Sequence, residues 1–263
     1  MRLIQALFLT EGDTKPTTLG KDNPLWSLYD IHERILKDIA LGVDEFLIFP
    51  VPVAKEQDPT WSWIGEAIHK IKDRYAYESK LAVDLCLCST MPDGHCHHPE
   101  EERSRELMIN QARAVHRAGA DTLAPSDCQP HTVKDIRTQI PEAHIMSYST
   151  KFRSTFYRGY REAMSIEKGI ERTYQLDVND REGAIQRSVD YSNDGADELM
   201  VKPGITGIDL IEPIKQRTGK PCGVFQTSGE WLGIGAPGSL QETHDVFQRA
   251  GADYMISYGA RLL

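Results

Sequence analysis

The chain repeats one pattern of polar and apolar positions. A stretch with the apolar spacing of a helix is followed by a glycine, an acidic residue and a short apolar run. The pattern occurs at residues 41–44, 118–121, 194–197 and 250–253. Glycine just past a helix forms a cap, because it adopts a positive φ without steric cost. Each apolar run is then a buried strand, so these junctions predict repeated β/α units and a parallel sheet.

Eight apolar runs are predicted to be strands. They lie at residues 3–9, 45–50, 81–88, 122–125, 144–149, 198–202, 221–226 and 254–258. Helical patterns lie between them, for example at residues 29–41, 63–75, 101–118 and 240–250. Eight alternating units favour a (β/α)8 TIM barrel, an α/β fold, over an open sheet.

We expect one barrel domain over residues 1–263, because no linker or low-complexity tract divides the chain. A chain of 263 residues has the usual size of such a barrel. The outer helix after the last strand is expected to be missing, since only five residues follow Tyr258. A hydrophobic content of 40% with 26% charged residues indicates a globular protein.

The formal net charge of -9 argues against nucleic acid or an anionic membrane as a partner, since both favour basic patches. The apolar run at residues 3–9 is too short for a signal peptide. No run approaches the roughly 20 apolar residues of a membrane span. Five cysteines are an odd number without a secretory signal, so we expect them to be reduced and the protein to be cytoplasmic. A small anionic substrate remains compatible with this charge, because a few arginines could hold it.

Polar side chains follow the predicted strands at the end where a barrel gathers its catalytic groups. In order they are Asp84, Cys86, Cys88, Ser126, Asp127, Lys151, Lys202, Ser228 and Tyr258. An apolar site disfavours an ammonium ion, so a buried lysine loses its proton easily and can attack a ketone to form a Schiff base. Solvation is the alternative for either lysine taken alone. Two lysines in apolar contexts favour amine catalysis on a carbonyl substrate.

Three cysteines are candidates for a metal site. Cys86 and Cys88 alternate with leucines and are predicted to share one face of the third strand. Cys96 lies in a polar loop at residues 93–98, where a thiol has no packing role. Three thiolates suit zinc and leave a fourth position for water or substrate. For the pair on the strand, packing in the core is the alternative.

The remaining cysteines and histidines carry weaker signals. Cys128 and Cys222 have no such context and are predicted to be structural. His95, His97 and His98 flank Cys96 and are either further metal ligands or exposed side chains.

Arginines and aromatic residues are concentrated between Lys151 and Gln175. The arginines are Arg153, Arg158, Arg161 and Arg172. A solvated charged face is one interpretation of this run. Because the run follows a candidate catalytic lysine, we favour a lid whose arginines grip a carboxylate group bidentately.

Taken together, the motifs resemble the porphobilinogen synthase (5-aminolaevulinate dehydratase) family over most of the chain, most densely from Val83 to Tyr258. The resemblance is carried by residues 84–88, 94–96, 118–127, 145–152, 161–163, 173–175, 200–203, 228–230 and 250–253. Their order and approximate spacing are those of the family. The resemblance implies a cytoplasmic barrel lyase that condenses two molecules of 5-aminolaevulinate into porphobilinogen, with loss of two waters.

The resemblance also implies residue roles. For the first substrate they are Lys202 as the Schiff-base lysine, Asp84 and Ser126 near the amine, and Ser228 and Tyr258 at the carboxylate. For the second substrate they are Lys151 as the Schiff-base lysine, with Arg161, Arg172 and Gln175 at the carboxylate. Cys86, Cys88 and Cys96 match the family's zinc site. An iminium acidifies the adjacent carbon and zinc polarises a carbonyl or a water, so the implied chemistry is coherent.

The chain departs from the family at its periphery and at one position of the site. One residue is lost between Arg161 and Gln175, so that either Arg172 or Glu171 fills the second carboxylate-binding position. Two alternatives therefore stay open. One is a related enzyme that joins a different amino-ketone or keto-acid through the same lysines. The other is a non-catalytic, metal-binding paralogue.

The family's N-terminal arm, which wraps a neighbouring subunit, is missing from this sequence. Parallel barrel strands are apolar on both faces and need cover. Without the arm and the last helix, the outer face of the last and first strands is expected to lack cover. We therefore predict a homodimer or a small homo-oligomer that buries this seam.

Overall fold

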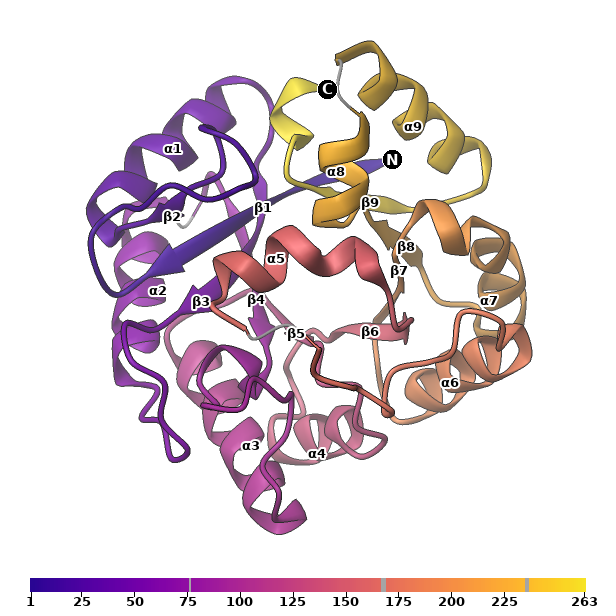
Figure 1. Cartoon of the computed structure of the whole chain (residues 1–263), viewed down its shortest axis with the longest axis horizontal. Coiled ribbons are helices and arrows are strands. Elements are labelled where there is room, and N and C mark those ends of the chain that lie inside the picture. Colours follow the sequence, from indigo (N-terminus) through magenta and orange to yellow (C-terminus); the bar gives the residue numbers. More distant parts are fainter. Residues whose placement is uncertain (76, 167–168, 235–236) are drawn as a thin grey trace.

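Parallel strands form a nearly closed barrel in the computed structural model, which describes residues 1–75, 77–166, 169–234 and 237–263 (Figure 1). The barrel strands are β1 (Arg2–Thr10), β3 (Glu45–Val51), β4 (Lys80–Leu85), β5 (Thr122–Pro125), β6 (Met146–Lys151), β7 (Glu198–Lys202), β8 (Cys222–Phe225) and β9 (Tyr254–Ser257). Their order around the barrel is β5-β4-β3-β1-β9-β8-β7-β6. A short strand, β2 (Leu25–Trp26), pairs with the end of β1. Between β5 and β6 the ladder is a single bridge from Leu123 to Ile145.

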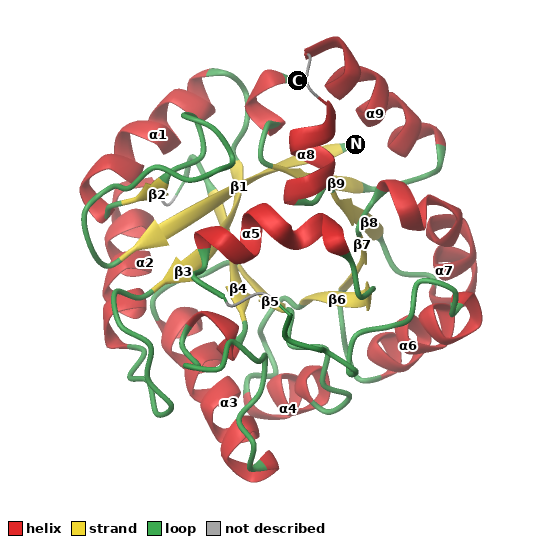
Figure 2. Cartoon of the chain, in the orientation of Figure 1, coloured by secondary structure: helices red, strands yellow, loops and turns green. Residues whose placement is uncertain are grey.

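Helices surround the barrel (Figure 2). They are α1 (Leu28–Ala40), α2 (Ser62–Tyr75), α3 (Glu101–Arg117), α4 (Thr132–Gln139), α6 (Arg181–Asn193), α7 (Ile211–Thr218) and α9 (Pro237–Arg249). The shorter helices α5 (Arg158–Ala163) and α8 (Ser228–Ile234) lie over the carboxyl end of the barrel (Figure 1). Gly42, Gly119, Gly195 and Gly251 follow α1, α3, α6 and α9 with φ between 89° and 107°. The predicted glycine caps and the (β/α)8 barrel are therefore confirmed.

The strand sequences are continuous apolar runs because both faces of each strand are buried. Along β1, Ile4, Ala6 and Phe8 pack in the interior of the barrel. Leu7 and Leu9 pack in the separate layer between the strands and the outer helices. This alternation between two apolar layers is what a parallel barrel requires.

The third predicted strand ends earlier than the sequence indicated. β4 stops at Leu85, and Leu87–Ser89 form a 3-10 turn. The Cys86 sulfur caps this turn by accepting a hydrogen bond from the Cys88 N–H at 3.4 Å. The prediction that Cys86 and Cys88 share a strand face is therefore wrong, because the turn and not the strand pleat places both thiols. The other predicted strands agree with the observed ones to within two residues at each end.

The last turn of the chain, η4 (Ala260–Leu262), covers part of β1. The Arg261 N–H donates to Gln5 Oε1 at 3.2 Å, and Gln5 Nε2 donates to the Tyr258 carbonyl at 2.9 Å. Gln5 is fully buried as a result. The seam that was expected to be bare is therefore partly covered by the chain itself, and the homo-oligomer stays a prediction.

Among the residues that the structure describes, no helix is both long and apolar enough to cross a bilayer.

Candidate active site

A β-bulge directs Lys151 into the barrel. Along β6, Tyr148 packs in the interior, and regular alternation would bring Thr150 inward next. The register with β7 shifts between Ser147 and Thr150. Thr150 instead hydrogen-bonds to α6 on the outside. Lys151 is thereby turned inward and pairs in register with Lys202 at the end of β7.

Lys202 lies in a cage of aromatic rings. Its side chain is buried, and its Nζ is 3.8 Å from the centroid of the Phe225 ring. The other rings, with centroids 4.9 to 5.9 Å from Nζ, belong to Phe49, Tyr148, Tyr157 and Tyr160. Burial and the Lys151 ammonium group lower the pKa of Lys202 to about 7. A large share of this amine is therefore neutral and nucleophilic near neutral pH.

Lys151 has different surroundings. It is buried, and its Nζ donates a hydrogen bond to the Ser126 carbonyl at 2.5 Å. Burial alone would lower the pKa of Lys151. The negative charge of nearby thiolate groups outweighs burial and raises the pKa; these groups belong to Cys128, Cys96, Cys86 and Cys88. The expectation that burial makes both lysines lose a proton easily therefore holds for Lys202 and is wrong for Lys151.

Asp84, near the end of β4, is buried and interacts with both lysines. Burial raises the pKa of the Asp84 carboxyl group, and the opposing attraction of Lys151 and Lys202 is weaker. The hydroxyl groups of Ser126 and Tyr148 lie beside the carboxyl group. Asp84 can therefore hold or release a proton close to both amines.

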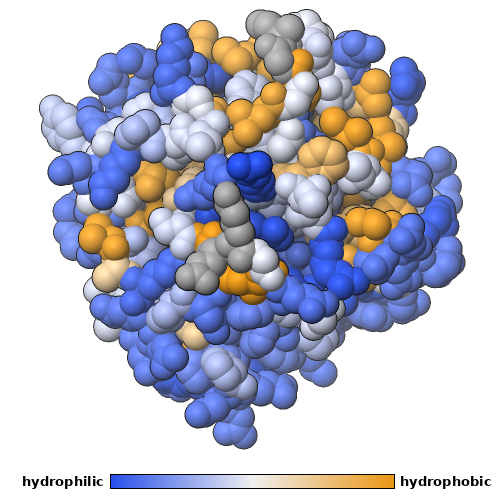
Figure 3. Space-filling model, viewed as in Figure 1, coloured by the Kyte–Doolittle hydropathy of each residue, from blue (hydrophilic) through white to orange (hydrophobic). Residues whose placement is uncertain are grey.

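The two lysines face a small cavity beneath α5. Its volume is about 20 Å³, which is room for roughly one water. The wall is formed by Cys88, Cys96, Ser126, Lys151, Tyr157, Tyr160, Arg161, Ile166, Arg172, Gln175 and Lys202. Helix α5 crosses the barrel mouth (Figure 1), and hydrophilic side chains gather at the centre of this face (Figure 3). α5, which supplies Tyr160 and Arg161 to the cavity wall, occupies the position expected for a lid.

Arg172, and not Glu171, faces the cavity. Arg172 is buried in the cavity wall, whereas the Glu171 side chain is 76% exposed and lies 3.8 Å from Arg153. Arg161 and Gln175 line the same wall. The structure thus brings together the three residues expected at the second carboxylate, and Arg172 lines the cavity with them where Glu171 does not.

Ser228 and Tyr258 are buried but are outside the wall formed by the described residues. Ser228 Oγ accepts a hydrogen bond from the Tyr160 N–H at 3.0 Å and donates one to the Phe156 carbonyl at 3.0 Å. Ser228, at the start of α8, therefore links this helix to the backbone at Phe156 and at Tyr160 of α5. Tyr258 packs in the interior, with its ring stacked on Phe8 at 5.8 Å between centroids. A role of either residue at the first carboxylate requires the lid to open.

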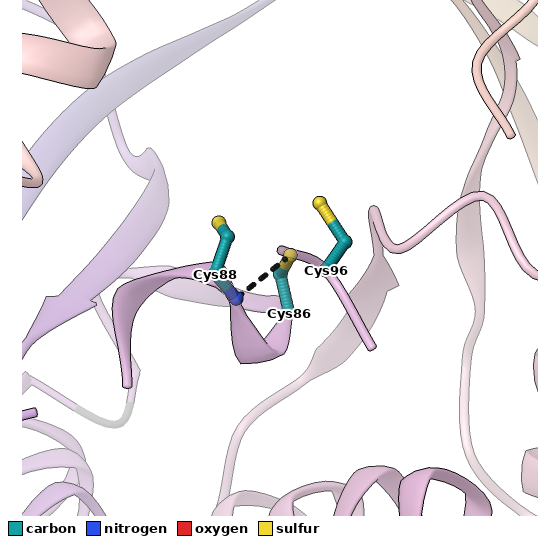
Figure 4. Close-up of side chains that lie close together, drawn as sticks. All are labelled: Cys86, Cys88 and Cys96. Atoms are coloured by element: carbon teal, nitrogen blue, oxygen red, sulfur yellow. Dashed lines mark hydrogen bonds between the residues drawn. The ribbon is translucent and has the colours of Figure 1, made fainter. Parts of the chain in front are cut away.

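Cys86, Cys88 and Cys96 bring three sulfur atoms within 4.8 Å of one another (Figure 4). All three cysteines are buried, and Cys88 and Cys96 line the cavity wall. Three soft sulfur donors at this spacing fit a thiophilic metal ion. The cluster could therefore hold a metal ion.

Several aromatic residues of the site were not singled out from the sequence. Tyr157 donates to the Lys202 carbonyl at 3.1 Å, and the Tyr160 hydroxyl lies 3.9 Å from Cys88 Sγ. Their signal in the sequence is the density of aromatic residues after Lys151, which points to the predicted lid as a whole and not to single residues.

Buried paired lysines beside a thiol cluster, at the carboxyl end of a parallel barrel, are the arrangement of an enzyme that acts on carbonyl compounds through amines. Comparison with known families agrees. The family model for delta-aminolevulinic acid dehydratase matches residues 1–263. The chain belongs to this family of lyases, and the resemblance noted from the sequence is confirmed.

Individual relatives support the assignment. The delta-aminolevulinic acid dehydratase of Synechococcus elongatus is 32% identical, over 95% of this chain and 86% of the relative. The Helicobacter pylori enzyme of the same name is 30% identical, over 98% of this chain and 88% of the relative. The crystal structure of the Toxoplasma gondii enzyme, porphobilinogen synthase in complex with its product porphobilinogen, superposes with a TM-score of 0.91 at 25% identity. That match covers 98% of this chain and 82% of the other.

Proposed function

We propose that this protein condenses two molecules of 5-aminolaevulinate into porphobilinogen, with loss of two waters, through Schiff bases on Lys202 and Lys151. The observation that carries the proposal is the register pairing of the two lysines in one cavity wall. Family membership supports it. The product is a pyrrole, so the reaction serves tetrapyrrole synthesis.

The first step takes place at Lys202. Its neutral Nζ attacks the ketone carbon of the first substrate, a C–N bond forms, and the ketone oxygen leaves as water. The resulting iminium acidifies the adjacent carbon. The Asp84 carboxylate accepts the released proton, and the raised pKa of Asp84 suits this group to return the proton later.

The second substrate forms its Schiff base with Lys151. Thiolate charges raise the pKa of Lys151, so these charges must be compensated, by protons or by a bound cation, before this amine becomes nucleophilic. Arg161, Arg172 and Gln175 hold the carboxylate of this substrate, because guanidinium groups bind carboxylates through charge-assisted, bidentate hydrogen bonds. Carbon–carbon and carbon–nitrogen bonds between the two substrates then close the ring and release both lysines.

Cys86, Cys88 and Cys96 would hold a zinc ion. Bound there, zinc supplies Lewis acidity toward a carbonyl or water oxygen at the cavity. The support is the donor set itself, since three sulfur atoms within 4.8 Å of one another are a poor fit for magnesium or calcium.

Ser228 and Tyr258 bind the carboxylate of the first substrate once α5 has moved away. In the closed arrangement, Ser228 Oγ is bound to the backbone of Phe156 and Tyr160. Displacement of the lid frees this hydroxyl group for a carboxylate oxygen.

Incubation with 5-aminolaevulinate, followed by a colour reaction for pyrroles, tests the proposal. Porphobilinogen should form with the wild-type protein and not with Lys202→Arg, whose guanidinium cannot form the imine. Borohydride reduction and mass measurement identify the Schiff base. An adduct only with another ketone would favour a related enzyme with a different substrate. No adduct with any ketone would favour a non-catalytic paralogue.

A further inference from the structure

We infer that Tyr174 is a positioning residue that couples the metal loop, residues 93–98, to the clamp segment, residues 169–177. The clamp segment carries Arg172 and Gln175, and the metal loop carries Cys96. The inference rests on the proposed function, because it takes the cysteine cluster as the metal site. Its consequence is that metal binding and the placement of the carboxylate-binding arginine depend on each other.

The first contact joins Tyr174 to the metal loop. The Cys96 backbone N–H donates a hydrogen bond to Tyr174 Oη at 3.1 Å. The Tyr174 ring meets the His97 ring edge-on, with centroids 5.0 Å apart, and lies 6.2 Å from the His95 ring. One side chain therefore contacts the backbone of the candidate ligand and the residues on both sides of it.

The second contact joins Arg172 to the same loop. Arg172 Nη2 donates to the Gly94 carbonyl at 2.7 Å, and this bond is buried. Gly94 has a φ of 68°, and a Cβ there would lie 3.0 Å from Ile166 Cγ2 and 3.3 Å from Ile170 Cδ1. The metal loop is therefore covered closely by the residues that precede Arg172, and glycine is required at this position.

The clamp segment is anchored at its other end to the barrel. The Leu176 N–H donates to the Lys151 carbonyl at 3.1 Å, and Arg187 Nη1 of α6 donates to the Tyr174 carbonyl at 3.0 Å. Lys151 is itself one end of the bulged strand β6. The clamp segment thus connects β6, the strand that carries Lys151, to the metal loop.

These contacts predict that Tyr174 affects the affinity of the cysteine cluster for a metal ion. Residues that hold a metal ligand in place typically change metal affinity by 10- to 100-fold when they are altered. Coupling between two sites is also reciprocal. An ion that fixes Cys96 therefore orders the clamp segment and keeps Arg172 facing the cavity, and an ordered clamp segment in turn strengthens metal binding.

The test is the zinc affinity of Tyr174→Phe, measured by competition with a chromogenic chelator in the absence of substrate. The variant keeps the ring between the histidines and loses only the hydroxyl group. We expect zinc to bind about 10- to 100-fold more weakly than to the wild-type protein. Tyr75→Phe is the matched control, since it also removes one tyrosine hydroxyl bonded to the backbone: Tyr75 Oη donates to the His32 carbonyl at 2.9 Å, outside the metal loop and the clamp segment. Its zinc affinity should be unchanged.

Hydrogen exchange of the wild-type protein provides the second measurement. Amides of residues 169–177 should exchange more slowly with zinc than without it, and this protection should be smaller in Tyr174→Phe. The inference is overturned if Tyr174→Phe and the wild type bind zinc with equal affinity. It is also overturned if zinc does not change the exchange rates of residues 169–177, or if the wild-type protein binds no zinc. If the variant fails to fold, the wild-type exchange decides alone. Failure of the wild-type protein to form porphobilinogen would refute the proposed function. It would not change the predicted ratio of the zinc affinities of wild type and Tyr174→Phe.

Discussion

Lys151 and Lys202 are register partners on the neighbouring strands β6 and β7, and both line one cavity. Their surroundings give them different protonation states. Burial and the ammonium group of Lys151 lower the pKa of Lys202 to about 7, whereas the negative charge of thiolate groups raises the pKa of Lys151. If both lysines form Schiff bases as proposed, this difference predicts that Lys202 reacts first.

Lys202→Arg should abolish Schiff-base formation at the first site and lower kcat by about 10³-fold or more, because the group that forms the covalent bond is lost. Lys151→Arg should still trap one substrate. Borohydride reduction followed by peptide mass mapping distinguishes the two variants. Turnover of Lys202→Arg at the wild-type rate would refute the mechanism.

The rate of the first Schiff base should rise as the pH increases through about 7, where Lys202 loses its proton. Lys151→Met removes the like charge beside Lys202, so the pKa of Lys202 should increase and the profile should move to higher pH. Rates of adduct trapping measured across this range test both statements. A shift to lower pH in Lys151→Met would contradict the assigned cause.

Arg172→Gln should weaken the binding of the second substrate and lower kcat/KM by about 10- to 150-fold. This factor corresponds to the free energy of one hydrogen bond to a charged group. Glu171→Gln is the control, because the Glu171 side chain is 76% exposed and points away from the cavity. Its kinetics should match those of the wild type. The reverse ranking of the two variants would place Glu171 at the carboxylate.

Metal analysis of protein prepared without chelator should find about one zinc per chain, and Cys86→Ser should lose it. Chelation should abolish activity and leave the barrel folded, since the layer between the strands and the outer helices contains none of the three cysteines. Cys222→Ala is the control, because this buried cysteine lies in the outer core layer. Full activity of metal-free protein would leave the three thiols with a packing role only.

His144 should make stability depend on pH at the opposite end of the barrel. A hydrogen bond to Glu198, opposed by burial and helped by the charges of Glu198 and Asp197, raises the pKa of His144 above its ordinary value of 6.5. The stabilisation of the fold by protonated His144 is fully present below the ordinary pKa and is lost as the pH rises through the raised pKa. The free energy of this stabilisation should be below about 1 kcal/mol, since the His144 side chain is 45% exposed.

Thermal unfolding of wild type and His144→Gln, from about pH 5.5 to about pH 8.5, checks this. The wild type should be the more stable at low pH, and the difference should vanish at high pH. A difference that is the same at every pH would assign His144 a packing role.

The barrel could be predicted from the sequence because its signal is local and repeated. Gly42, Gly119, Gly195 and Gly251 each mark a helix end, and the strand after each is buried on both faces. Lys202 was also predictable, since it continues the regular alternation of β7, in which Met200 points inward and Val201 outward.

Other parts of the site depend on irregular backbone that periodicity cannot reveal. Cys86 and Cys88 are placed by a 3-10 turn and not by a strand, and Lys151 is placed by a bulge. The choice between Arg172 and Glu171 depends on how the clamp segment folds onto the metal loop. Ser228 is bound to the lid backbone in the closed arrangement, which a family motif does not show.

The bulge in β6 makes the chemistry of this strand a matter of residue count as well as residue identity. Deleting one residue between Ser147 and Thr150 would remove the extra residue of the bulge, so that Lys151 would follow the inward Tyr148 by two positions and still face the cavity. Straightening the strand with every residue kept would instead turn Lys151 toward α6 and remove the second amine from the cavity. A lysine at this position therefore faces the cavity either three residues after the inward tyrosine with a bulge, or two residues after it without one.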